Sequence, residues 1–190
     1  MIAALDPSSQ ITAASVAKRL SLSGDARAAL ESDGGNVRGF LDELIGRGLP
    51  ADALTLVAHT LPKRYVVAWA CDCLKAAIAR DPRASDMDRA GLALTQQWLA
   101  DPTEDNRRAA LDFAERGEFG SPGAWIAASA GWSDGSLLPR GYDVIAPPDH
   151  LPAEAAVAAL RLAASRGPDF AATINGFVAR ALKLFAPNTR

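Results

Sequence analysis

Apolar residues recur at helical spacing along most of the chain, and the longest such stretch runs over residues 61–80. Pro62 fits the first turn of a helix, because its missing N–H needs no partner there. The helix must end near Asp81, since the residue before Pro82 avoids the α region. Most of its circumference is apolar, which is typical of a buried helix, so we expect it at the centre of the fold.

The polar side chains of this helix are confined to one side. At about 100° per residue, three of them fall within an arc of about 80°. These three are Arg64, Asp72 and Lys75, and Lys63 stands beside the arc. We interpret the group as an ion cluster, which serves either as structural pairing or as a recognition patch.

The same spacing predicts helices on both sides of this segment. Several residues suit the cap or first-turn positions of these helices: Asn36, Pro50, Ser85, Thr103, Ser121, Pro152 and Asp169. Asp88, three residues after Ser85, would complete a capping box in which Asp replaces the usual Glu.

Three of these helices carry apolar stripes that we expect to face the core. In the helix after Ser85 the predicted stripe is Met87, Ala90, Gly91, Leu94 and Trp98. In the next helix it is Ala109, Ala110, Phe113 and Ala114. In the last helix it is Phe170, Ile174, Phe177, Val178, Ala181, Leu182 and Phe185.

No segment has the alternating pattern of a β-strand, and short loops make neighbouring helices antiparallel. We therefore predict an all-α fold, a compact stack of about nine or ten antiparallel helices that is either HEAT-like or an irregular bundle. We expect a single domain over residues 1–190, with residues 1–10 as a loose arm. The pattern at 49–53 recurs at 151–155, which hints at layered helix pairs.

One long segment, residues 133–150, has no helical period, because three prolines and two glycines interrupt it. Its start, Ser133-Asp134-Gly135-Ser136, has the composition of a turn and lacks the context of a nucleophile. The segment also carries large apolar side chains: Leu137, Leu138, Tyr142, Val144 and Ile145. We therefore expect an ordered loop packed along the surface of the helices.

Composition narrows the class of protein. Of 190 residues, 49% are hydrophobic and 22% are charged, and the formal net charge is -2. These values suit a soluble globular protein and lack the basic excess of a general nucleic-acid binder. The longest apolar run, residues 65–71, is far shorter than the ~20 residues of a membrane helix. We expect a cytoplasmic protein that binds neither nucleic acid nor membrane.

Few residues could carry chemistry. Cys71 and Cys73 point about 200° apart on one helix, so they cannot share a metal or a disulfide, and we interpret them as core residues. Catalysis by a thiolate would need His59 or His150 beside it, and nothing in the sequence brings them together. No phosphate-binding, metal-binding or nucleophile motif is present, so we expect no catalytic residue, cofactor or metal.

Recognition of a partner is the chemistry that the sequence does allow. We expect three of the four tryptophans in the core and Trp132, beside the long loop, partly exposed. The candidate partner-binding residues lie on the polar strip and around the loop: Lys63, Arg64, Asp72, Lys75, Trp132, Leu137, Leu138 and Tyr142.

Several strings in order resemble a known family. They are Leu61-Pro62-Lys63-Arg64 leading to Trp69-Ala70-Cys71, then Asp101-Pro102-Thr103-Glu104 with Arg107-Arg108, then Gly123-Ala124-Trp125 leading to Trp132-Ser133-Asp134-Gly135. Over residues 45–185 the chain resembles uncharacterised all-helical proteins of proteobacteria, which look like companions of type VI secretion gene clusters. The resemblance implies a helical fold and supplies no catalytic residue.

Together these observations favour a non-enzymatic interaction protein, an accessory or adaptor of a secretion apparatus, whose loop and a helix face form the binding surface. Its partner would be a secretion component or an effector. Two alternatives stay open. One is an immunity protein, and the other is a small-ligand binder or enzyme with a cleft near Arg64, Asp72 and Cys71.

Overall fold

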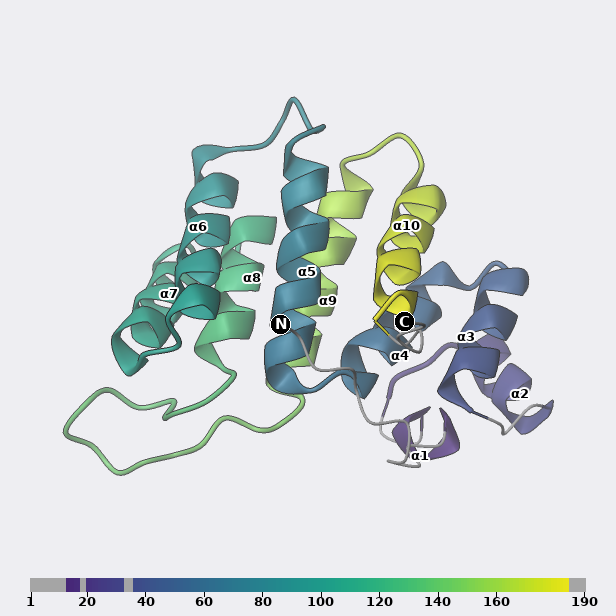
Figure 1. Ribbon diagram of the computed structural model, residues 1–190, viewed down its shortest axis with the longest axis horizontal. Coiled ribbons are helices and arrows are strands. Elements are labelled where there is room, and N and C mark those ends of the chain that lie inside the picture. The colour runs from purple at the N-terminus through teal and green to yellow at the C-terminus, as the bar shows by residue number, and fades with distance from the viewer. Residues whose placement is uncertain (1–12, 18–19, 33–35, 185–190) are drawn as a thin grey trace, which may run out of the picture. The chain divides into compact units, whose positions relative to one another are not determined.

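The computed structural model describes residues 13–17, 20–32 and 36–184 (Figure 1). Within these ranges the chain forms ten helices and no strand, which confirms the predicted all-α fold. The helices are α1 (Ala13–Ala17), α2 (Gly24–Ser32), α3 (Val37–Gly46), α4 (Pro50–Thr60), α5 (Lys63–Ile78), α6 (Asp86–Ala100), α7 (Glu104–Arg116), α8 (Pro122–Gly131), α9 (Leu151–Ser165) and α10 (Phe170–Leu182). The predicted arm over residues 1–10 lies outside the described residues.

The chain groups into two compact units. One comprises Met1–Thr60 with Ala171–Arg190, and the other comprises Leu61–Phe170. The single domain over residues 1–190 therefore stays a prediction, and each unit is described by itself. No helix in the described part of the chain has the length and hydropathy that crossing a bilayer requires.

In the first unit, a side-chain cap begins α3, and the side chain of Asp52 joins α4 to the segment before α2. The side chain of Asn36 accepts a hydrogen bond from the N–H of Gly39 at 2.8 Å, which confirms the predicted cap of α3. Asp52 in the first turn of α4 accepts hydrogen bonds from the N–H and the hydroxyl of Ser23, at 2.8 and 2.9 Å. These bonds tie the segment before α2 to α4.

The predicted stripe of α10 is confirmed at its centre and not at its ends. Its buried residues are Ile174, Phe177, Val178 and Ala181. Phe170 is 37% exposed, because it lies at the start of the helix, and Leu182 is half-buried. Phe185 lies outside the described residues.

The second unit is built around α8, which contacts α5, α6, α7 and α9 (Figure 1). Nine of its ten residues are buried, and most of them are Gly, Ala or Ser. Small side chains let neighbouring helices approach closely, so α8 can lie among the other four. The sequence placed α5 at the centre, whereas the structure gives that place to α8.

Helix α5 nevertheless has the predicted faces. Trp69, Cys73 and Leu74 are buried, while Arg64, Asp72 and Lys75 are exposed. Pro62 is the N-cap of the helix and not its first residue. The polar strip therefore faces solvent along a helix that is otherwise packed on its neighbours.

The buried faces of α6 and α7 are rotated about the helix axis from the predicted stripes, by about the angle between successive residues. Met87 is 40% exposed and Ala90 is exposed, so this part of the prediction is wrong. The buried positions of α6 are Asp88, Gly91, Leu92, Thr95 and Trp98. Those of α7 are Arg107, Ala110, Leu111 and Ala114. The physical reason is that two charged residues, Asp88 and Arg107, have partners inside the unit and occupy positions that a hydrophobic pattern assigns to solvent.

Helices α6 and α8 cross at a pair of glycines. A Cβ atom added to Gly91 would lie 2.0 Å from the carbonyl oxygen of Gly123. A Cβ atom added to Gly123 would lie 2.4 Å from the carbonyl oxygen of Met87. Because these neighbours are backbone atoms, neither position can accept a side chain without separating the helices.

The fully buried carboxylate of Asp88 joins α6 to the first turn of α8 and to the end of α9. It accepts hydrogen bonds from the N–H of Ser85 at 2.9 Å, the guanidinium of Arg166 at 2.6 Å and the N–H of Gly123 at 3.3 Å. Ser85 caps α6 in return, which confirms the predicted capping box. Burial alone would raise the pKa of Asp88, but the hydrogen bonds outweigh burial and lower the pKa.

We predict that Gly91→Ala lowers the free energy of unfolding by about 3 kcal/mol or more, because the new methyl group overlaps the backbone of α8. Urea unfolding followed by circular dichroism measures the change. Gly176→Ala is the matched control, since no described atom outside the nearby backbone of its own helix lies within 4 Å of its added Cβ. That control should be neutral or stabilising by up to about 1 kcal/mol, because Ala favours helix. Equal stability of the Gly91 variant and the wild type would contradict the crossing.

We also predict a pH-dependent role for Asp88. Its pKa is lower in the folded chain than in the unfolded chain, so its contribution is present above about pH 4 and is lost as pH falls further. Asp88→Asn should be about 3 kcal/mol less stable than wild type at neutral pH, with the difference narrowing in acid. Asp86→Asn is the control, because the Asp86 side chain is fully exposed. A difference that stays constant into acid would contradict this role.

Candidate functional site

The candidate site begins with the guanidinium of Arg107, which is 1% exposed and lies inside the second unit. Glu104, one turn earlier in α7, accepts two of its hydrogen bonds, from Nε at 2.7 Å and from a terminal nitrogen at 2.7 Å. The carbonyl of Gly131, at the end of α8, and the carbonyl of Ser136, at 3.1 Å, accept the others. Arg107 therefore fastens the start of the long loop to α7 and α8.

Arg108 makes a second attachment from the same helix. Its Nε donates to Glu104 at 2.7 Å, and its terminal nitrogen donates to the carbonyl of Leu138 at 2.7 Å. Glu104 thus orients both arginines. We call these three residues, Glu104, Arg107 and Arg108, the arginine clamp. The guanidinium of Arg107 beside Glu104 holds the pKa of that carboxyl below its usual value.

The loop makes internal bonds next to the clamp. The hydroxyl of Ser136 accepts hydrogen bonds from the N–H groups of Leu138 and Ile145, both at 3.1 Å. The N–H of Leu137 donates to the carbonyl of Ile145 at 2.8 Å. These bonds bring the two sides of the loop together and close its base, and farther along the loop Arg140 pairs with Asp105 of α7.

Gly135 is required where the loop passes the clamp. Its φ is +71°, and an added Cβ would lie 2.6 Å from Nε of Arg107 and 2.8 Å from an oxygen of Glu104. Only glycine combines this backbone conformation with so close an approach. The turn predicted at Ser133-Asp134-Gly135-Ser136 is therefore also the surface on which the buried arginine packs.

Three apolar side chains in the second half of the loop are exposed. Tyr142 is 70% exposed, Val144 is 80% exposed and Ile145 is 50% exposed. The expectation that the whole loop packs along the helices is wrong for these residues, because the clamp binds the backbone at Ser136 and Leu138 and not their side chains. Leu137 and Leu138, next to the clamp, are half-buried, as a packed loop requires.

Trp132 lies at the base of the loop in an aromatic group with Trp125 and Phe119. The rings of Phe119 and Trp132 are stacked with centroids 5.6 Å apart, and Trp125 meets Trp132 edge to face at 6.5 Å. Trp132 is half-buried, as predicted, but so is Trp125, which the sequence assigned to the core. The two ring systems shield each other at the surface.

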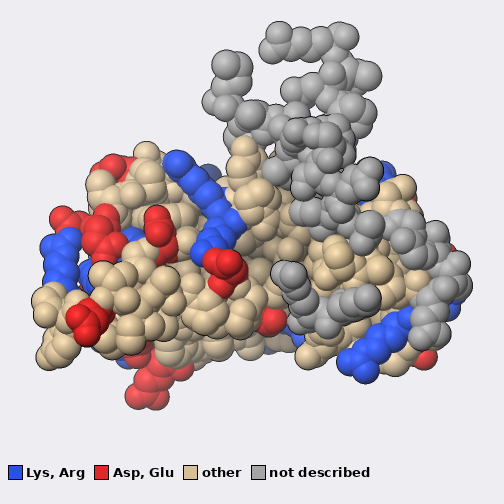
Figure 2. Space-filling model, turned by 90° about the horizontal axis from the view of Figure 1, so that it is seen from below, with Lys and Arg blue, Asp and Glu red and all other residues tan. Residues whose placement is uncertain are grey.

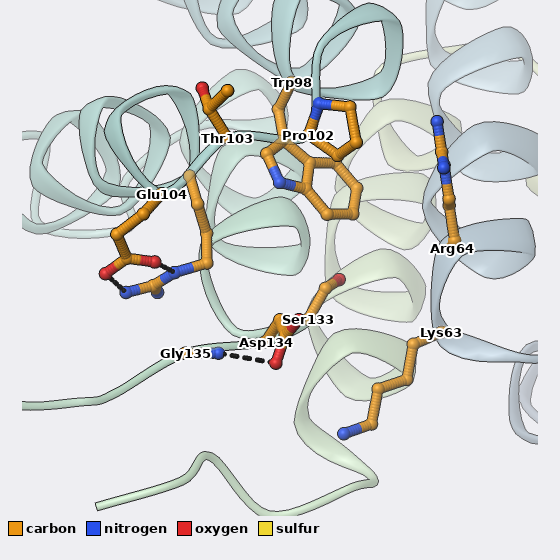
Figure 3. Close-up of a pocket in the computed structure, with 10 residues that line it drawn as sticks. Lys63, Arg64, Trp98, Pro102, Thr103, Glu104, Ser133, Asp134 and Gly135 are labelled. Carbon is orange, nitrogen blue, oxygen red and sulfur yellow. Dashed lines mark hydrogen bonds and ion pairs between the residues drawn. The ribbon is translucent and has the colours of Figure 1, made fainter. Parts of the chain in front are cut away.

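A cavity of about 450 Å³ opens beside the base of the loop. It is lined by Lys63, Arg64, Trp98, Pro102, Thr103, Glu104, Arg107, Ser133, Asp134 and Gly135. Figure 3 shows Lys63 and Arg64 of α5 on one side and Glu104 of α7 on the other, with Trp98 and Pro102 between them on the α6 side. Two predicted residues, Lys63 and Arg64, thus line the same cavity as Glu104 and Arg107 of the clamp, whereas Asp72, Lys75 and Cys71 do not line it.

Lys63 and Arg64 have different partners. The ammonium of Lys63 pairs with the exposed carboxylate of Asp149 at 2.6 Å, and this contact lowers the pKa of Asp149. The guanidinium of Arg64 donates to the carbonyl of Leu99 at 2.9 Å. Lys63 therefore attaches the far end of the loop to α5, as the clamp attaches its start to α7.

The cysteines do not form a reactive site. Cys71 and Cys73 are buried, as predicted. Burial, with a smaller effect of Asp72, raises the pKa of the Cys71 thiol to about 11, so it is protonated at neutral pH. Among the described residues, no group of three or more His, Cys, Asp or Glu side chains could hold a metal ion.

The charge on one face of the molecule is mixed. On the face seen in Figure 2, Lys and Arg side chains lie in small groups among Asp and Glu side chains, with uncharged surface between them. Such a distribution favours local contacts over binding to an extended charged surface.

Sequence reasoning missed the clamp as part of the site. The pairs Glu104/Arg107 and Glu104/Arg108, three and four residues apart, indicate ion pairs on one helix face. That signal was available, but helical periodicity cannot tell a buried arginine from an exposed one. Asp149, the partner of Lys63, had no signal in its neighbourhood.

We predict that Arg107→Met loosens the loop, because the carbonyls of Gly131 and Ser136 lose their donor and Glu104 loses its main partner. Amide hydrogen exchange of residues 133–146 should accelerate, and the free energy of unfolding should fall by about 3 kcal/mol. Arg116→Met on the exposed end of the same helix is the control and should change neither. Unchanged exchange in the loop would show that the clamp does not hold it.

Comparison with known proteins gives one match. No curated protein and no solved structure matches the chain. The model of DUF6931, a family of unknown function, matches residues 40–185 and thus all helices from α4 to α10. This range is close to residues 45–185, over which the sequence resembles an uncharacterised helical family. The chain belongs to DUF6931, a family of unknown function.

Proposed function

We propose that this protein is a non-enzymatic interaction module that presents the loop over residues 137–146 to a protein partner. The observation that carries the proposal is the exposure of Tyr142, Val144 and Ile145 on a loop whose base is fixed. Single exposed apolar residues are ordinary, but a group of them on one projecting segment is typical of a contact surface.

The attachments of the loop support the same function. Binding by a loose segment loses free energy when the segment becomes ordered, and a preformed loop avoids much of that loss. Here Arg107, Arg108 and Lys63 hold the loop at both ends. Tyr142 suits the contact as well, because Tyr is enriched at the energetically dominant positions of interfaces.

A non-enzymatic role is favoured over thiol chemistry. The alternative of an enzyme with a cleft near Arg64, Asp72 and Cys71 needs an accessible thiolate. Cys71 is buried, its pKa is raised to about 11, and it does not line the cavity beside Arg64. The proposal therefore assigns Cys71 to the core and leaves the cavity as a separate site.

The resemblance described above makes the proposal more specific. We propose that the partner is a component or an effector of a bacterial type VI secretion apparatus, which would make the protein an accessory or adaptor. An immunity protein would use the same loop against a toxin. The identity of the captured partner separates the two roles.

The test places a photo-crosslinking residue at Val144 in cells where the protein is native, and at Leu162 on α9 as the control. Leu162 is also an exposed apolar residue, at 39%, but lies outside the loop. We expect one partner to crosslink from position 144 and not from position 162.

The captured partner then allows a quantitative check. The double variant Tyr142→Ser/Val144→Ser should weaken its binding about tenfold or more, because two exposed anchors are lost, and Leu162→Ser should leave binding unchanged. Isothermal titration with purified proteins measures both. Equal affinity of the double variant and the wild type would rule out the loop as the binding surface.

A further inference from the structure

We propose that the cavity between α5, α7 and the base of the loop is a binding site for a small molecule that carries a carboxylate. The carboxylate would pair with Arg64, and an apolar part would lie against Trp98 and Pro102. This inference is independent of the proposed function, because it concerns the cavity and not the exposed end of the loop.

Arg64 lines the cavity and has donors to offer a ligand. Its guanidinium has five N–H donors in a planar fork, and the structure records one hydrogen bond for it, to the carbonyl of Leu99. No ion pair is recorded for it within the described residues. Its remaining donors suit a carboxylate, which a guanidinium binds through two parallel hydrogen bonds.

The acidic residues that line the cavity already have hydrogen-bond partners. Glu104 accepts hydrogen bonds from both Arg107 and Arg108. Asp134 accepts a hydrogen bond from the N–H of Gly135 at 2.8 Å and is exposed. Arg107 pairs with Glu104, and Lys63 pairs with Asp149. Among the cations that line the cavity, Arg64 is therefore the one that has no carboxylate partner within the described residues.

The cation next to Arg64 in the chain, Lys63, already binds a carboxylate. Lys63 pairs with Asp149, whose side chain is 94% exposed, so this carboxylate is held by the ammonium and not by burial. A ligand carboxylate that enters beside Arg64 would meet the same cationic turn of α5.

The size and lining of the cavity fit a small molecule. Its volume of about 450 Å³ lies in the range of ligand pockets, about 300–1,000 Å³. Trp98 and Pro102 supply apolar surface, and the hydroxyls of Thr103 and Ser133 add polar groups. A carboxylate on a compact apolar ring combines the features that these residues recognise.

The test uses sodium benzoate as the probe, with benzyl alcohol as the uncharged analogue and inorganic phosphate as another oxyanion. NMR titration follows the indole N–H of Trp98, assigned by its loss in Trp98→Phe. We expect a saturable shift with benzoate at millimolar affinity and no saturable shift with benzyl alcohol. Phosphate should bind more weakly than benzoate, because it has no apolar part.

Two variants complete the experiment. Arg64→Gln should weaken benzoate binding about tenfold or more, and Arg161→Gln, on the exposed side of α9, should leave it unchanged. Circular dichroism confirms that both variants are folded. An unsaturable shift with benzoate, equal binding by Arg64→Gln, or tighter binding of phosphate than of benzoate would each overturn the proposal. None of these results would bear on the crosslink from Val144.

Discussion

The structure of the second unit depends on one buried cation, Arg107, whose charge and N–H donors need partners inside the protein. A guanidinium at 1% exposure is costly unless nearly all of its donors have acceptors. Arg107 finds them on the side chain of Glu104 and on the carbonyls of Gly131 and Ser136. Because two of these acceptors are backbone atoms of α8 and the loop, satisfying the charge fixes where the loop begins.

A second buried charge, the carboxylate of Asp88, acts at the other end of α8. The carboxylate of Asp88 accepts a hydrogen bond from the N–H of Gly123 in the first turn of α8, and Arg107 donates to Gly131 at its end. An anion at the start and a cation at the end match the dipole of a helix. The small residues of α8 permit its close contacts, and the two charges satisfy backbone groups at its ends.

These two charges also explain what the sequence could predict. Caps at Asn36, Ser85, Thr103 and Ser121 are local signals, so the helices and their starts could be predicted from neighbouring residues. The inner faces of α6 and α7 could not, because a hydrophobic pattern places Asp88 and Arg107 outside. Their burial depends on partners far along the chain, such as Arg166 and Ser136.

In the candidate site, too, the sequence could predict some residues and not others. Lys63, Arg64 and Tyr142 could be selected from residue type, since a polar strip and an apolar loop are visible in one sequence. The cavity that joins Lys63 and Arg64 to Trp98 and Glu104 could not, because it forms only when α5, α6 and α7 are packed. Asp149 was missed for the same reason, since its partner lies on another helix.

The central claim is that the clamp holds the loop base in one conformation in solution. Backbone ¹⁵N relaxation of the wild-type protein tests it most directly, without any substitution. The account predicts order parameters near 0.8, typical of rigid backbone, for Gly135 to Leu138 and for Ile145. Values below about 0.6 at these positions would contradict it, because a base that moves on this timescale cannot preform the loop.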